Sequence, residues 1–240
     1  GVQPARYVAV TNAPVVINAF GDLDFVFNTQ YDFAERFNGE PDYFANKGEQ
    51  KGLLLDTNFV ADAINLPLVA PKERGAGGSH IRFSMARGHM NSHISQFGVG
   101  RYKKAHAHGP GAHVIIMSGE GYTLMWPEGE EPRRYEWKGG SMIVPPNAWF
   151  HQHFNTGTTA ARYLAFKAEG VSIRNAQGVP KGWISRRVGG DQIDYADESP
   201  RIRQWFTEAL AKCGLEPRMD DAYAAELAEL PAQDPQVVSR

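Results

Sequence analysis

Short runs of alternating apolar and polar residues, separated by glycine, proline and asparagine, make up the middle of the chain, from residue 79 to residue 167. A period of two is typical of a strand that buries one face, and regularly spaced short strands without intervening helices indicate an antiparallel sandwich or barrel. We predict eight strands, at residues 80–85, 92–97, 113–117, 122–126, 134–137, 141–144, 149–154 and 161–166. The two glycines within residues 118–121 predict a hairpin turn, because glycine adopts positive φ without strain.

The pattern changes on both sides of this β-rich region. Residues 1–60 are aromatic and interrupted by glycine and proline, which predicts an extended arm with short helical pieces such as residues 32–37. Near the C-terminus, Ser199 and Pro200 are suited to begin a helix and Gly214 to end it, and a second helix is predicted at residues 221–230. The apolar face of the first helix would hold Ile202, Phe206, Leu210 and Cys213. We therefore predict one domain, with an N-terminal arm (1–78), a barrel (79–170) and a C-terminal helical extension (171–240).

Composition narrows the class of protein. Hydrophobic residues make up 42% and charged residues 22% of the chain, as in ordinary folded proteins. The formal charge of −2 provides no overall field toward nucleic acid or an anionic membrane, so we expect a small-molecule partner instead. The single cysteine, Cys213, excludes an intramolecular disulfide and favours a reducing, cytoplasmic setting. No apolar stretch approaches the roughly 20 residues that cross a bilayer, and the start lacks a secretory pattern.

Histidines carry the main functional signal. Five of the eight fall within residues 106–113 and 151–153. Side chains alternate along an extended strand, so His106 and His108 share one face, as do His151 and His153. A turn at residues 109–111 would direct His113 back toward the same point. The prediction is a metal site of His106, His108, His113 and His151, with the alternative that His113 only supports a three-histidine site by hydrogen bonding.

Neutral imidazoles bind Mn, Fe, Co, Ni, Cu and Zn without help from thiolates or carboxylates, and iron is our leading assignment. A divalent ion held by imidazoles alone keeps its positive charge and has open positions. Such a site favours an anionic or chelating guest, for example an enolate, a catecholate or a hydroxy acid.

Further candidates line the expected cavity. His153 shares a face with His151 and is our candidate proton donor, with an ordinary core histidine as the alternative. Four residues are expected to line the substrate cavity, namely His93, Tyr122, Trp126 and Trp149. Lys103 and Lys104 lie beside the histidines and are expected in a solvated turn. The chain has no HExxH, GxSxG or P-loop motif, so the usual hydrolase and nucleotide-binding signatures are absent.

The histidine segments also resemble two known motifs. The first comprises Gly100, His106, His108, His113 and Gly119, and the second Gly140, Pro146, Asn147, Ala148, His151 and Asn155. Together they are similar to the two motifs of the cupin superfamily, whose metal-binding histidines would correspond to His106, His108 and His151. The resemblance implies an all-β, cupin-type antiparallel β-barrel, or jelly roll. It departs from the family where His113 replaces a glutamate, where Gly119 comes one residue early, and where Ala148 replaces a glycine.

Residues 102–126 are loosely similar to bacterial single-domain cupins, some of which are labelled as activators of ethanolamine ammonia-lyase. Three hypotheses on function remain open. The leading one is an iron-dependent dioxygenase acting on a small oxygenated organic molecule. The second is a non-redox lyase, isomerase or decarboxylase that uses the metal as a Lewis acid, and the third a small-molecule-binding cupin without catalysis. The apolar arm and a free sheet edge favour a homodimer.

Overall fold

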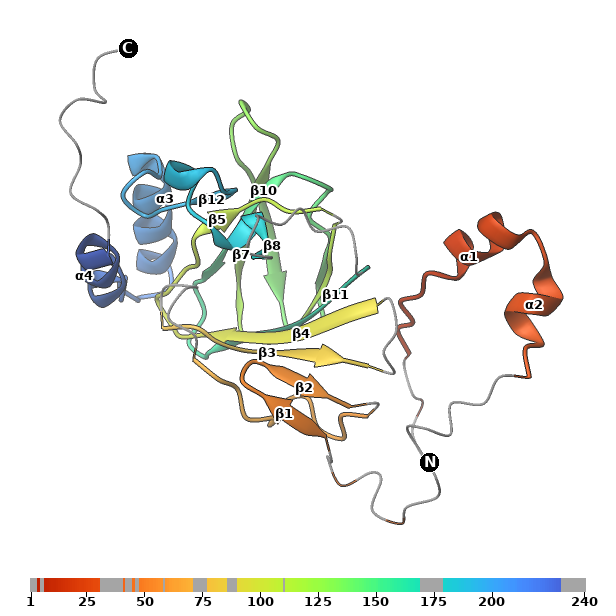
Figure 1. The fold of residues 1–240 in the computed structure, drawn as a ribbon. Helices are drawn as coiled ribbons and strands as arrows, with labels where there is room; N and C mark the ends of the chain where they lie inside the picture. Colours follow the sequence, from red (N-terminus) through yellow and green to blue (C-terminus); the bar gives the residue numbers. More distant parts are fainter. Residues whose placement is uncertain are drawn as a thin grey trace.

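The computed structural model describes residues 4, 7–30, 41, 45, 48–57, 59–70, 77–85, 90–109, 111–168 and 179–229. Its centre is a pair of β-sheets (Figure 1). The seven-stranded sheet has the order β1 (Glu49–Lys51), β2 (Leu54–Asp56), β3 (Ser79–Ser84), β4 (Met90–Phe97), β11 (Ala161–Ala168), β6 (His113–Ser118) and β9 (Met142–Ile143). The five-stranded sheet has the order β12 (Gln192–Ile193), β5 (Ala105–His106), β10 (Phe150–Asn155), β7 (Glu120–Trp126) and β8 (Arg133–Lys138). Neighbouring strands are antiparallel except for β2 and β3.

All eight predicted strands are present, within one or two residues of their expected ends. Four short strands, β1, β2, β5 and β12, were not predicted, because segments of two or three residues show no periodicity. Two of them, β1 and β2, lie in the segment predicted as an arm and extend the larger sheet beyond β3.

The predicted hairpin at residues 118–121 is wrong. Strand β6 ends at Ser118 and β7 begins at Glu120, but the two strands belong to different sheets. Gly119 therefore carries the chain from one sheet to the other. It has a φ of +84°, and a Cβ there would lie 2.7 Å from the Cα of Ala161. Both the positive φ and the close approach require glycine at this corner.

The inner faces of the two sheets pack against each other. Phe97 of β4 and Ile116 of β6 form one buried cluster with Trp137 of β8, which belongs to the other sheet. Residues of both sheets thus share an interior, as in a sandwich or jelly roll. Three of the four histidines predicted to bind metal, His106, His108 and His151, lie toward one end of this interior.

The outer face of the five-stranded sheet is covered by helices α3 (Pro200–Ala211) and α4 (Asp220–Glu229), which Figure 1 shows beside it. Tyr122, Leu124 and Phe154 of the sheet are buried against Ile202 and Phe206 of α3. The prediction that Cys213 lies on the apolar face of this helix is wrong, since α3 ends two residues earlier and Cys213 is exposed.

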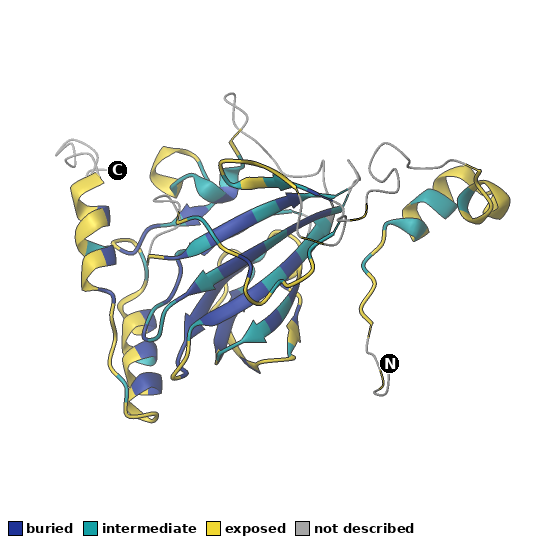
Figure 2. Cartoon of the chain, turned by 90° about the horizontal axis from the view of Figure 1, so that it is seen from below, coloured by how far each residue is buried: buried dark blue, intermediate teal, exposed yellow. Residues whose placement is uncertain are grey.

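The N-terminal helices are α1 (Ala13–Phe20) and α2 (Leu23–Phe27), and neither contains a buried residue. Figures 1 and 2 show them apart from the sheets, with most of their residues exposed. The predicted helical piece at residues 32–37 lies outside the described residues. Among the helices described, none combines the length and the apolar character required to cross a membrane.

Candidate metal centre

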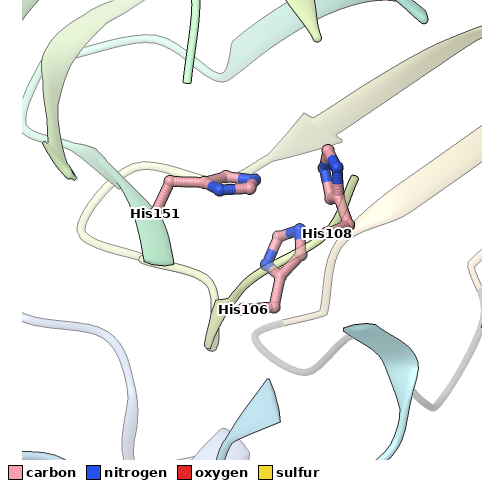
Figure 3. Close-up of side chains that lie close together, drawn as sticks. All are labelled: His106, His108 and His151. Carbon is pink, nitrogen blue, oxygen red and sulfur yellow. The ribbon is translucent and has the colours of Figure 1, made fainter. Parts of the chain in front are cut away.

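Two neighbouring strands bring the three motif histidines together. His106 ends β5, and its register partner on the adjacent strand β10 is His151. His108 follows His106 by two residues and therefore points to the same side. Figure 3 shows the three imidazoles turned toward a common point.

The geometry of this group suits one metal ion. One ring nitrogen from each of His106, His108 and His151 lies within 4.8 Å of the corresponding atoms of the other two. The ring centroids of His106 and His151 are 4.3 Å apart, and those of His108 and His151 are 4.8 Å apart. His106 and His151 are buried and His108 is half-buried, so the group lies inside the protein but is open on one side. The three histidines can hold a metal ion.

Backbone carbonyl groups set the orientation of two of these rings. The Nδ1 atom of His106 lies 3.3 Å from the carbonyl oxygen of Lys104, and the Nδ1 atom of His151 lies 3.1 Å from that of Trp149. A carbonyl oxygen only accepts hydrogen bonds, so in each pair Nδ1 carries the proton and donates it. The lone pair of each ring is then on Nε2, which is the atom that a metal binds. This support by a neighbouring acceptor is typical of histidine ligands.

His113 must be corrected as a fourth ligand. It begins β6 with an exposed side chain, whereas Ala112 and Val114 on either side of it are buried and line the cavity next to the three histidines. Because side chains alternate along a strand, His113 points away from the interior. The alternative of a three-histidine group is the one that the geometry supports.

A cavity of about 280 Å³ opens beside the three rings. Its apolar walls include Phe150, Tyr163 and Trp183, and Lys167 and Lys181 also line it. Two carboxylates, those of Glu128 and Asp191, lie in its wall as well, as do the predicted residues His93 and His153. The two lysines balance the two carboxylates, so a bound divalent ion would leave the cavity positively charged.

His153 lies one step deeper than His151 on β10, with its ring centroid 5.7 Å from that of His151. Its Nδ1 atom is 2.8 Å from the hydroxyl oxygen of Thr123, and that oxygen accepts a hydrogen bond of 3.0 Å from the indole nitrogen of Trp137. All three side chains are buried. His153 is thus held in one orientation at the cavity wall.

Three of the predicted lining residues lie elsewhere. Tyr122 belongs to the outer core under α3, and Trp126 packs against the same core. Trp149 does not line the cavity; the guanidinium of Arg133 lies 5.5 Å from its ring centroid. Both faces of β7 are buried, so the alternating apolar residues Tyr122 and Trp126 did not reveal which face lines the cavity and which is covered by α3.

Some residues of the interior were missed in the sequence. Lys103 was expected in a solvated turn but is buried, with its ammonium group 3.2 Å from the hydroxyl of Tyr163 and hydrogen-bonded to Ser95. The alternation of Tyr163, Ala165 and Lys167 along β11 would have identified this side of the cavity. Trp183 has no such signal, because it ends a 3-10 helix of only three residues (Lys181–Trp183), which is too short to show a period.

No family model and no curated protein sequence matches the chain. Among solved structures, it is similar to a mutant of the oxalate decarboxylase OxdC of Bacillus subtilis, with 14% identity, 44% of this chain and 28% of that chain covered, and a TM-score of 0.39. The capsular polysaccharide assembling protein CapF from Staphylococcus aureus is 17% identical, with 53% of this chain and 34% of that chain covered and a TM-score of 0.39. An RmlC-like cupin family protein with a double-stranded β-helix fold from Methanocaldococcus jannaschii is 22% identical. The match covers 34% of this chain and 71% of that chain, with a TM-score of 0.28.

The match spans about a third or less of the OxdC and CapF chains. Of the three, the Methanocaldococcus jannaschii protein is described as a cupin.

Proposed function

We propose that this protein is a cupin-type metalloenzyme that binds one divalent transition metal through His106, His108 and His151 and oxidises a small oxygenated organic molecule with dioxygen. The observation that carries the proposal is the convergence of three imidazole nitrogens, all within 4.8 Å of one another, at the wall of a cavity of about 280 Å³. The donor set fits the group, because neutral imidazole nitrogens suit iron and its neighbours in the first transition series, and His106 and His151 keep the Nε2 lone pair for the metal.

When bound, a redox-active ion such as iron would supply a positive centre for the oxygen atoms of substrate and dioxygen. The cavity supports a substrate that carries negative charge. Lys167 and Lys181 can attract an anionic group, and the aromatic side chains of Tyr163 and Trp183 exclude water from it. Hydroxy acids, catechols and diketones combine these properties with a size that suits the cavity.

His153 is the chain's own candidate for proton transfer. The hydroxyl of Thr123 already accepts the indole N–H of Trp137, so its own proton is available for the Nδ1 atom of His153. This chain of donors would keep the proton of the neutral imidazole on Nε2. In this neutral form His153 would donate a hydrogen bond from Nε2 to a substrate oxygen, about one strand step from the metal. As the imidazolium, with the hydroxyl oxygen of Thr123 then accepting from Nδ1, it would transfer the Nε2 proton to that oxygen and return to the neutral form.

The experiment is oxygen consumption by protein loaded with iron(II), measured with a panel of catechols, hydroxy acids and diketones. We expect oxygen uptake coupled to loss of one substrate in the panel. The variant His108→Ala should lose this activity, and His113→Ala is the matched control that should retain it. Activity that persists with zinc and without oxygen would select the non-redox alternative. Binding without turnover would select a binding protein, and no turnover with any metal would refute the enzymatic proposal.

A further inference from the structure

A second cavity, of about 240 Å³, lies on the other side of the five-stranded sheet, at the start of α3. None of its described lining residues lines the metal cavity. Strand β10 separates the two, because Gln152 alternates with His151 and His153 and points to the opposite face. The wall of the second cavity combines carboxylates, one amide and two indoles.

Gln152 provides a buried acceptor in the wall of the second cavity. The side chain is 1% exposed, and its Nε2 group donates a hydrogen bond of 3.2 Å to Oε2 of Glu198. Its carbonyl oxygen, Oε1, is buried and has no hydrogen-bond partner among the described residues. If the amide of Gln152 were flipped, its oxygen would face the carboxylate oxygen of Glu198, and both atoms are acceptors. The hydrogen bond to Glu198 therefore fixes which way the Gln152 amide points. Buried carbonyl oxygens are rarely left unpaired, and an unpaired one in a cavity wall calls for a donor.

The polar groups around this acceptor are mostly acceptors too. Glu198 is almost fully buried, and Glu130 and Glu131 line the same cavity. Arg201 is the one cation among the described lining residues. Its guanidinium is engaged by the carboxylate of Glu131 at 3.1 Å and lies 4.9 Å from the ring centroid of Trp205. Arg203 donates to Glu198 at 3.1 Å and Arg133 pairs with Glu130 at 2.7 Å, so the carboxylates have partners and Oε1 of Gln152 is the acceptor in this wall that still lacks a donor among the described residues.

The remaining wall is aromatic and aliphatic. Trp126 and Trp205 are partly buried and both line the cavity, together with Ile202. Indole rings attract organic cations through their π faces and also pack against alkyl chains. One buried acceptor without a donor among the described residues, combined with two indoles, favours a guest that has a charged N–H donor at one end and a short apolar body.

We propose that this cavity is a second ligand site that binds a small primary organic ammonium compound, whose N–H groups donate to Oε1 of Gln152 and to the carboxylate of Glu198. The alkyl part of the ligand packs between the indoles of Trp126 and Trp205. This site is independent of the metal, since it lies on the opposite face of β10 from His151.

The test is isothermal titration calorimetry of the full chain with n-butylammonium chloride. The matched probes are 1-butanol, which has the same apolar body without charge, tetramethylammonium, which is a cation without N–H groups, and sodium butyrate. We expect n-butylammonium to bind at least about tenfold more tightly than each of the three, because only it combines charge with donors. Equal binding of 1-butanol or tetramethylammonium, or no binding of n-butylammonium, would overturn the proposal.

Variants locate the bound probe. Gln152→Leu removes the buried acceptor at similar size, and Trp205→Leu removes an indole at the partly buried wall, so the second variant remains informative if the first unfolds. Each should weaken n-butylammonium roughly tenfold. His108→Ala, at the metal centre, should leave this affinity unchanged. Retained affinity in both cavity variants, or loss of affinity in His108→Ala, would show that the probe binds elsewhere.

Discussion

Replacing His151 by alanine and, separately, His113 by alanine distinguishes three metal ligands from four. Both residues belong to the motif histidines, but only His151 contributes a nitrogen to the group whose atoms lie within 4.8 Å of one another. His113 is exposed on the other face of its strand. We therefore expect metal binding to fail in His151→Ala and to persist in His113→Ala.

The size of the effect follows from linkage. At a free metal concentration of about 100 times the dissociation constant, binding stabilises the folded state by about 2.7 kcal/mol. For a chain of this length, about 2–4 °C of melting temperature correspond to 1 kcal/mol, so saturating metal should raise the midpoint by about 5–10 °C. Loss of one ligand of three should weaken binding by at least about 100-fold, given that losing a supporting hydrogen bond alone costs about 10–100-fold. The same metal concentration would then stabilise the variant by only about 0.4 kcal/mol, or about 1 °C.

The assay is thermal unfolding of chelator-treated protein with and without added Co²⁺, Ni²⁺ or Zn²⁺. Native protein and His113→Ala should show the full upward shift, and His151→Ala should show almost none. The shift of each variant is measured against its own metal-free midpoint, so any change in intrinsic stability cancels. A full shift in His151→Ala, or a lost shift in His113→Ala, would refute the three-histidine centre.

Three further outcomes are expected. Ala148 has a φ of +61°, so Ala148→Gly should raise the free energy of unfolding by about 0.5 kcal/mol in urea titrations, the strain relief exceeding the entropy cost of glycine. A Cβ on Gly182 would lie 2.7 Å from the carbonyl oxygen of Ala107, so Gly182→Ala should destabilise by about 1–3 kcal/mol and weaken metal binding, both measurable by thermal unfolding. Burial raises the pKa of Glu198 above its ordinary value of 4.5, so the folded state binds this proton more tightly. The stability of native protein relative to Glu198→Gln should therefore fall as the pH rises from 4.5 through the folded pKa, in urea titrations at several pH values.

The strands and three of the histidines were predictable because both follow from the alternation of side chains. The interior runs of β4, β7 and β10 are long enough to show a period of two. The same rule put His106 with His108 and His151 with His153 on common faces, and these pairs do share the interior. Alternation does not determine which face the first residue of a strand presents after a turn. In β6 the faces are shifted by one residue from the prediction, so His113 points outward and Val114 points inward.

Strand β7 shows a second limit of the pattern. Its two faces are both buried, one against the other sheet and one against α3. Hydrophobic periodicity identifies a buried face only when the other face meets water. It therefore could not show that Tyr122 packs under the helix, or that Thr123 on the other face forms a hydrogen bond with His153. Contacts between residues far apart in the sequence also could not be predicted from the pattern of apolar and polar residues. Trp183 reaches the metal cavity from a segment without any period, and Lys103 is buried by Tyr163, which lies 60 residues away along the chain.

Strand β10 explains why both candidate sites occur where they do. All six of its residues are buried, yet four of them, His151, Gln152, His153 and Asn155, are polar. A buried polar group must find a partner, so each of the four has to be accounted for.

Asn155 is satisfied by the protein itself, because its amide nitrogen donates to the carbonyl oxygens of Gly98 and Thr159 at 3.0 and 2.9 Å. His153 is held by Thr123, and His151 donates its Nδ1 proton to a carbonyl and directs Nε2 toward two other imidazoles. Gln152 uses its donor on Glu198, and its carbonyl oxygen has no partner within the part of the chain that the structure describes. Asn155 therefore has a structural role. Under the two proposals, His151 and Gln152 would bind their ligands on opposite faces of one strand, the metal on one side and an ammonium group on the other.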